Sequence, residues 1–176
     1  AYPQSPAAQP LLELVRRSEG KEETLASRVV TVGKDQWCAM QVRASGSRII
    51  ASLDGVPLLQ VRDESAGAGA VGMYAEAGAA IFDDVSVSPW LAGYEPEGDP
   101  SAAWLIESGE WTHSGDGVVA GTGKAMPAFK PCADASVHVP IRLGEAQAAG
   151  VYLRDHGEGR YLAALVRQNP NVVARL

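Results

Sequence analysis

The sequence predicts an all-β protein, a two-sheet antiparallel sandwich, and three observations support this fold class. Apolar and polar residues alternate in runs of five to nine along the whole chain, and a period of two is that of a strand. Gly, Asp, Asn and Pro interrupt these runs at short intervals, as turn residues do. No segment of ten or more residues keeps the period of a helix. Short strands separated by turns are typical of a sandwich or barrel.

The alternating runs give the expected strands in order along the chain. They are 11–16, 24–32, 36–44, 48–53, 56–61, 70–75, 79–87, 110–113, 118–122, 136–143, 148–154, 161–166 and 172–176. Asp54-Gly55 separates two of these runs and favours a two-residue hairpin, because both residues tolerate a positive φ. A longer Gly-containing loop at 155–159 predicts a second hairpin.

One face of each expected strand should be buried in the core, because alternate side chains point to the same side of a sheet. This reasoning predicts buried positions at Val42, Ile50, Leu59, Val61, Phe82, Val85, Val151 and Leu153.

A break in the pattern divides the chain. The chain has 176 residues, enough for one ordinary domain and few for two. The segment 91–103 is rich in Gly, Pro and acidic residues and is typical of a linker, so the chain divides into 1–90, a linker at 91–103, and 104–176.

The charge and hydropathy of the chain limit the classes of partner that can be expected. Fifteen basic against 21 acidic residues give a net charge of −6, and the basic residues lie scattered, so neither nucleic acid nor an anionic membrane is an expected partner. No apolar run approaches a membrane span of about 20 residues. The first residues resemble no signal peptide and do not begin with Met, which indicates a processed product or an excerpt of a longer protein.

Two cysteines, Cys38 and Cys132, lie far apart and show no metal or redox spacing. We expect Cys38 to be a buried thiol in a strand. A disulfide between Cys38 and Cys132 is the alternative.

Two series of segments resemble a known superfamily. The first comprises WCAMQV at 37–42, RIIASLDG at 48–55, GAVGMY at 69–74 and AIFDDVSV at 80–87. The second comprises WLIESGEWTHSGDG at 104–117, ADASVHVPIRL at 133–143, AGVYLR at 149–154 and GRYLAAL at 159–165. The first series resembles the C-terminal half, and the second the N-terminal half, of concanavalin A-like lectin/glucanase domains, including the laminin G-like and 3-keto-disaccharide hydrolase-like families. The resemblance implies a jelly roll whose two halves stand in inverted order.

Two arrangements fit this order. Either residues 1–90 and 104–176 form one permuted sandwich, or the chain spans parts of two tandem repeats. An echo between 2–15 and 161–176, at an offset of 160 residues, favours repeats. An incomplete sheet edge would seek a strand from a neighbour, so we expect self-association or pairing with neighbouring repeats.

Catalytic residues are not evident. A glycosidase needs two carboxylates across the scissile bond, and the alternating acids of strand-borne glucanase sites are absent. The histidines His113, His138 and His156 lie near no Ser or Cys nucleophile motif. We therefore expect no enzyme.

The resemblance implies a structural calcium ion as the one candidate cofactor. The FDDV segment resembles one that lends an Asp to calcium in several carbohydrate-binding sandwiches, and the candidate ligands are Asp83, Asp84 and Glu107. The alternative is that one of the aspartates faces water and the other caps a bulge. The aromatic residues that could stack on a sugar, although core packing is favoured for each, are Trp37, Trp104, Trp111, Tyr152 and Tyr161.

The expected function is therefore binding or adhesion by a non-catalytic module at the cell surface or outside the cell, with a glycan as the expected ligand. Two alternatives stay open. One is a filament or coat subunit that assembles by exchange of strands or half-domains. The other is a sugar-acting glycoside hydrolase.

Overall fold

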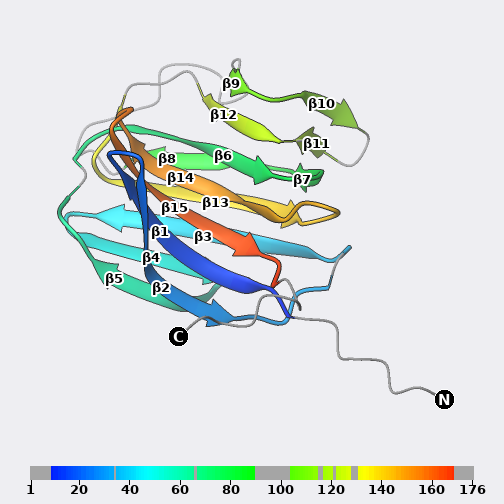
Figure 1. The fold of residues 1–176 in the computed structure, drawn as a ribbon, viewed down its shortest axis with the longest axis horizontal. Coiled ribbons are helices and arrows are strands. Elements are labelled where there is room, and N and C mark those ends of the chain that lie inside the picture. The colour runs from blue at the N-terminus through cyan, green and yellow to red at the C-terminus, as the bar shows by residue number, and fades with distance from the viewer. Residues whose placement is uncertain are drawn as a thin grey trace.

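The computed structural model describes residues 9–33, 35–65, 67–89, 104–114, 117–120, 122–127 and 131–168. These residues form two antiparallel sheets that pack face to face (Figure 1). The prediction of an all-β, two-sheet antiparallel sandwich is confirmed. The expected linker and the expected strand 172–176 lie outside the described residues.

The two sheets contain the following strands, each in spatial order. The seven-stranded sheet consists of β2 (Lys21–Val29), β1 (Leu11–Ser18), β15 (Gly159–Val166), β14 (Ala148–Asp155), β6 (Ala70–Glu76), β12 (Gly123–Pro127) and β9 (Trp104–Ser108). The eight-stranded sheet consists of β10 (Trp111–Ser114), β11 (Gly117–Ala120), β7 (Ala80–Phe82), β13 (Ala135–Arg142), β3 (Trp37–Ser45), β4 (Arg48–Leu53) and β5 (Val56–Arg62), with β8 (Ser86–Pro89) paired to β13.

Each sheet contains strands from both parts of the sequence. In the seven-stranded sheet β1 pairs with β15, and β6 lies between β14 and β12. In the eight-stranded sheet β13 lies between β7 and β3. Within this chain each half thus supplies strand partners for the other, as the neighbouring blue and red-orange strands β1 and β15 show in Figure 1.

The core lies between the sheets and contains the inner residues of both. Five of the predicted core positions are buried there, namely Val42, Leu59, Phe82, Val151 and Leu153. Val61 and Val85 are partly buried and pack against the same cluster. The predicted burial of Ile50 in the core is wrong. Ile49 fills the core, and Ile50 lies on the outer face, opposite Arg43 and Gln60.

The Asp54-Gly55 hairpin is confirmed. Leu53 pairs with Val56, and φ is 49° at Asp54 and 78° at Gly55, the two positive values of a type I′ turn. The hairpin predicted around 155–159 is also present, since β14 pairs with β15. The expected strand 79–87 is interrupted, because Asp84 adopts a φ of 42° between β7 and β8.

Cys38 and Cys132 are both buried and both free, so the buried-thiol prediction for Cys38 is confirmed and the disulfide alternative is wrong. The Cys38 thiol lies 3.5 Å from the carbonyl oxygen of Ile141. Burial raises the pKa of this thiol to about 12, which keeps it protonated and inert at neutral pH. The described residues include no helix long and apolar enough to cross a bilayer.

Candidate functional site

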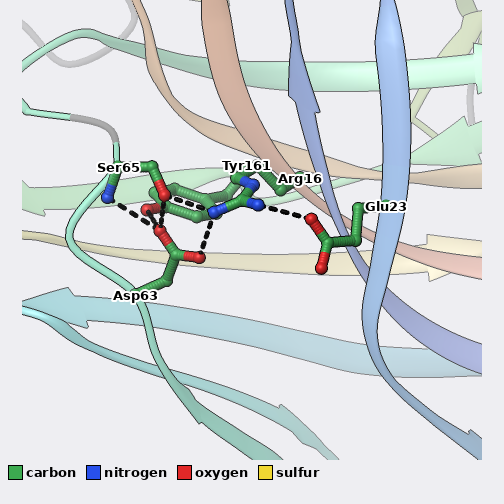
Figure 2. A network of polar contacts seen from close by, with 5 residues as sticks. All are labelled: Arg16, Glu23, Asp63, Ser65 and Tyr161. Carbon is green, nitrogen blue, oxygen red and sulfur yellow. Dashed lines mark hydrogen bonds and ion pairs between the residues drawn. The ribbon is translucent and has the colours of Figure 1, made fainter.

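A polar network ties the two sheets together at one end of the sandwich (Figure 2). Arg16 of β1 donates from Nη1 to Asp63 Oδ2 at 2.7 Å, and Tyr161 of β15 donates from Oη to Asp63 Oδ1 at 2.6 Å. The backbone N–H of Ser65 donates to the same Oδ1 at 2.8 Å. Arg16 also pairs with Glu23 of β2. Asp63 directly follows β5, so the network connects the edge of one sheet to the other sheet.

The network keeps Asp63 ionised. Burial by itself would raise the pKa of Asp63, but the hydrogen bonds from Ser65 and Tyr161 and the charge of Arg16 outweigh it and hold that pKa below its usual value. The Asp63 side chain is 11% exposed. This end of the sandwich therefore has a fixed, charged junction.

Two turns meet beside this junction. Glu19 and Gly20, with φ of 52° and 75°, form the turn between β1 and β2, and 156–158 connect β14 to β15. The N–H of Glu19 donates to the carbonyl oxygen of Glu158 at 3.0 Å, which fixes the two turns against each other. The strands β1 and β15 are paired along their length, so their turns necessarily lie at the same end.

A surface pocket of about 350 Å³ lies between these turns. Its lining consists of Arg17, Ser18, Gly20, Lys21, Glu22, Gly157, Glu158, Gly159 and Arg160, among which no side chain is apolar. A second hollow of about 190 Å³, lined in part by Ser65 and His156, adjoins it through residues that both share. The pocket presents three cations and two carboxylates on a backbone that three glycines leave open.

Ion pairs hold Arg17, Glu22 and Arg160 of the pocket in place. Arg17 pairs with Glu22 across the β1–β2 hairpin and lies over the ring of Tyr74, 5.5 Å from its centroid. Arg160 donates from Nη1 to Asp155 Oδ2 at 2.8 Å. Side chains fixed in this way lose little conformational entropy when a ligand binds.

A second charged cluster continues from Arg160 over the outer face of the seven-stranded sheet. Lys124 Nζ lies 3.5 Å from both Glu107 Oε2 and Asp155 Oδ2, and 5.6 Å from the centroid of the Tyr152 ring. The Tyr152 hydroxyl is buried and makes no hydrogen bond in the part of the chain that the structure describes. Tyr152 lies against Gly72, where any Cβ would fall 2.4 Å from its hydroxyl.

A bulge in β14 places Asp155 in this cluster. The pairing of β14 with β6 shifts register between Tyr152 and Asp155, and Arg154 between them has a φ of 53°. The Arg154 side chain is buried, and it donates to the carbonyl oxygens of Ala133 and Gly46, each at 2.6 Å. This anchoring keeps the bulge in one conformation.

The electrostatics of the cluster favour an ionised Asp155. Burial would raise the pKa of Asp155, but hydrogen bonds from Arg160 and the Gly157 N–H, with the charges of Arg160 and Lys124, lower it below the usual value. Burial, and after it the negative charges of Glu107 and Asp155, raise the pKa of Tyr152. The arrangement thus offers fixed acceptors and fixed cations, whereas the Tyr152 hydroxyl is buried.

The structure separates the three predicted calcium ligands. Asp83 and Asp84 lie between β7 and β8 of the eight-stranded sheet, whereas Glu107 lies on β9 of the other sheet and pairs with Lys124. Among the residues described, no three His, Cys, Asp or Glu side chains are grouped to hold a metal ion. The calcium site stays a prediction, and this geometry adds nothing in its favour.

The predicted aromatic residues mostly pack. Tyr152 and Tyr161 are 1% and 0% exposed, Trp111 stacks on Phe82 at 5.8 Å, and Arg142 covers the ring of Trp37 at 5.1 Å. The side chain of Trp104 lies outside the described residues. Sequence reasoning missed Lys21, Lys124 and Asp155. Lys124 and Asp155 meet only because β12 and β14 both pair with β6.

Comparisons with known proteins add no assignment. No protein-family model matches the chain, and no curated protein and no solved structure matches it.

Proposed function

We propose that the chain is a non-catalytic binding module of the concanavalin A-like kind, outside the cell or at its surface, whose ligand is a glycan. The proposed site is the pocket between the β1–β2 and β14–β15 turns, with the charged cluster around Lys124 as its extension. The polar lining of this pocket is the observation that carries the proposal.

A glycan presents hydroxyl groups that both donate and accept hydrogen bonds. The pocket offers both kinds of partner, because Lys21 and Arg17 donate while Glu22 and Glu158 accept. An apolar ligand would find no matching surface there. The absence of apolar side chains from the lining thus favours a polyhydroxylated ligand over a hydrophobic one.

Binding is favoured over hydrolysis by the state of the acids. A hydrolase needs one carboxyl group that stays protonated to act as the general acid. Glu107 and Asp155 both pair with Lys124, and the pKa of Asp155 is lowered. Carboxylates that pair with cations can orient a ligand, but they do not supply a protonated general acid. The hydrolase is therefore kept as the alternative.

A structural subunit is the other alternative, and it is favoured by the position of β2 at the edge of a sheet. This nine-residue strand pairs with β1 on one side and forms the edge of the seven-stranded sheet on the other. An exposed edge can add a strand from a neighbouring chain. Its charged residues Lys21, Glu22, Glu23 and Arg28 disfavour such pairing, so binding is the better supported function.

A glycan array followed by calorimetry tests the proposal. Lys21→Gln should weaken the best array ligand about fivefold, because one charged hydrogen bond to the ligand is lost. Arg28→Gln is the matched control, since it removes one charge from the same strand outside the pocket and should leave affinity unchanged. An array without hits, or equal losses in both variants, would contradict the proposal. Release of reducing sugar from a bound glycan would instead support the hydrolase.

A further inference from the structure

Strand pairing gathers arginines that lie scattered in the sequence onto the outer face of the eight-stranded sheet. The core takes one alternate set of residues in β3, β4, β5 and β13. The other set therefore points outward, and it contains Arg43, Arg48, Arg62 and Arg142 together with His138. We call these five residues the basic face.

Acidic residues are missing from the strands that form this face. Among the described residues of β3, β4, β5, β7, β8 and β13 there is no Asp or Glu. Three acids next to the strand ends have other partners: Asp63 binds Arg16, Asp134 pairs with Arg154, and Asp54 accepts from the Ala39 N–H at 2.8 Å. Asp35, Glu64 and Glu145 lie two or three residues beyond a strand end. Asp83 and Asp84 lie at the margin, between β7 and β8. In a chain of net charge −6, this face is a local positive surface.

Two of the arginines are direct cross-strand neighbours. Arg48 of β4 lies opposite Arg62 of β5, and both are exposed. Like charges in this position, with Cβ atoms about 5 Å apart, destabilise a sheet. Arg48 donates to Gln60 Oε1 at 2.6 Å, and within the described residues neither arginine forms an ion pair with an acid. A bound anion would remove this repulsion, so the pair is better suited to binding than to folding.

The other groups on the face indicate which anionic polymer fits. Polar side chains surround the arginines, with Gln41, Gln60, Ser86, Ser88 and Ser136 on the same side of the strands. These groups suit a hydroxylated polymer. Single-stranded nucleic acid needs open aromatic rings for stacking, but Trp37 is covered by Arg142. A membrane surface would need a contiguous apolar patch to insert, but the apolar residues on this side, Ile50, Ala39 and Pro140, lie among the polar ones.

We propose that the basic face binds an acidic polysaccharide, with Arg48 and Arg62 as the principal contacts. Guanidinium groups form paired hydrogen bonds to sulfate and carboxylate oxygens. Arg43 lies diagonally from Arg48, because its cross-strand partner Ile50 is two residues along β4. This site lies on the other sheet from the pocket of the proposed function. Either proposal can therefore be wrong while the other holds.

Heparin is the probe, with dextran as the uncharged polymer. The folded chain should bind heparin and not dextran, and the affinity should fall as salt rises. The double variant R48Q/R62Q should bind heparin about tenfold more weakly, with a shallower salt dependence. R62Q should keep or raise the melting temperature, because it removes a repulsive pair, and this shows that weaker binding is not unfolding.

Arg28→Gln is the matched control for R62Q, since each removes one exposed arginine from a strand. Arg28 lies on β2 of the other sheet, so R28Q should bind heparin as the unaltered chain does. Equal losses in R62Q and R28Q, or no loss in R48Q/R62Q, would overturn the proposal. Tighter binding to duplex DNA or to phosphatidylserine vesicles at the same ionic strength would overturn the assignment to a polysaccharide.

Discussion

Arg16 and Asp63, 47 residues apart in sequence, form an ion pair of 2.7 Å that joins the two sheets at one end of the sandwich. Asp63 also accepts from Tyr161, so one carboxylate is shared by β1, β15 and the segment after β5. The turns that form the candidate pocket lie at the same end. The junction therefore connects the stability of the fold to the geometry of the site.

Asp63→Asn should destabilise the chain by about 1 kcal/mol, because it removes the charge that pairs with Arg16, at a rim where solvent screens part of the interaction. Urea unfolding at neutral pH measures this. Glu64→Gln, the exposed neighbour, is the control and should change little.

The same carboxylate predicts a pH dependence. The folded-state pKa of Asp63 is lowered, so its contribution is present above the unfolded pKa of about 3.9 and is lost as pH falls through the folded value. The unaltered chain should therefore lose stability faster than Asp63→Asn in acid. If the stability of the two proteins fell in parallel as the pH is lowered, the Asp63 carboxylate would not make the contacts with Arg16 and Tyr161.

Phe82→Ala should cost about 3 to 5 kcal/mol, since it opens a cavity at a fully buried ring. Phe82 stacks on Trp111, so tryptophan fluorescence of the folded protein should change as well. Val56→Ala is the control, because Val56 is 56% exposed. A loss of unfolding free energy below about 1 kcal/mol would mean that the Phe82 side chain does not lie in the core.

Gly55→Val should destabilise the β4–β5 hairpin by about 1 to 2 kcal/mol. An added Cβ would meet nothing within 4 Å, so the cost comes only from the φ of 78°. Gly67 is equally open but has no positive φ, and Gly67→Val should be close to neutral. Similar unfolding midpoints for the two variants would contradict the type I′ turn.

Tyr74 should make the chain sensitive to alkali. Burial, and after it the hydrogen bond and charge of Glu76, raise the pKa of Tyr74 to about 12, against an unfolded value of about 10. Its contribution is present below the unfolded pKa and is lost as pH rises through the folded pKa. Between about pH 10 and about pH 12, Tyr74→Phe should therefore lose less stability than the unaltered chain. A steeper loss of stability in Tyr74→Phe than in the unaltered chain would contradict the raised pKa of Tyr74.

Local signals in the sequence predicted the local structure well. The strand 48–53 and the Asp54-Gly55 turn were predictable because turn chemistry and alternation act over a few residues. Ile49 and Ile50 are adjacent and equally apolar, so alternation alone could not decide which of them enters the core. The strands β9 and β12 were missed, since their short runs WLIES and GKAMP carry little alternation.

The candidate sites depend on contacts between distant strands. Lys124 meets Asp155 across 31 residues, and only the bulge at Arg154 turns Asp155 to the outer face. Arg48 and Arg62 become direct neighbours because the β4–β5 pairing shifts register between Ala51 and Ser52; the hairpin without this bulge would place Arg48 opposite Val61. Neither the pairing of distant strands nor the position of a bulge is evident from alternation and turn residues.

The central claim is that one chain closes both sheets by pairing its own halves, β1 with β15, β3 with β13 and β6 with β12. Sedimentation velocity over a wide concentration range tests it most directly. The account predicts one compact species of 18.4 kDa whose sedimentation does not change with concentration. Species that grow in mass with concentration would contradict it, because they would show that the halves pair between chains.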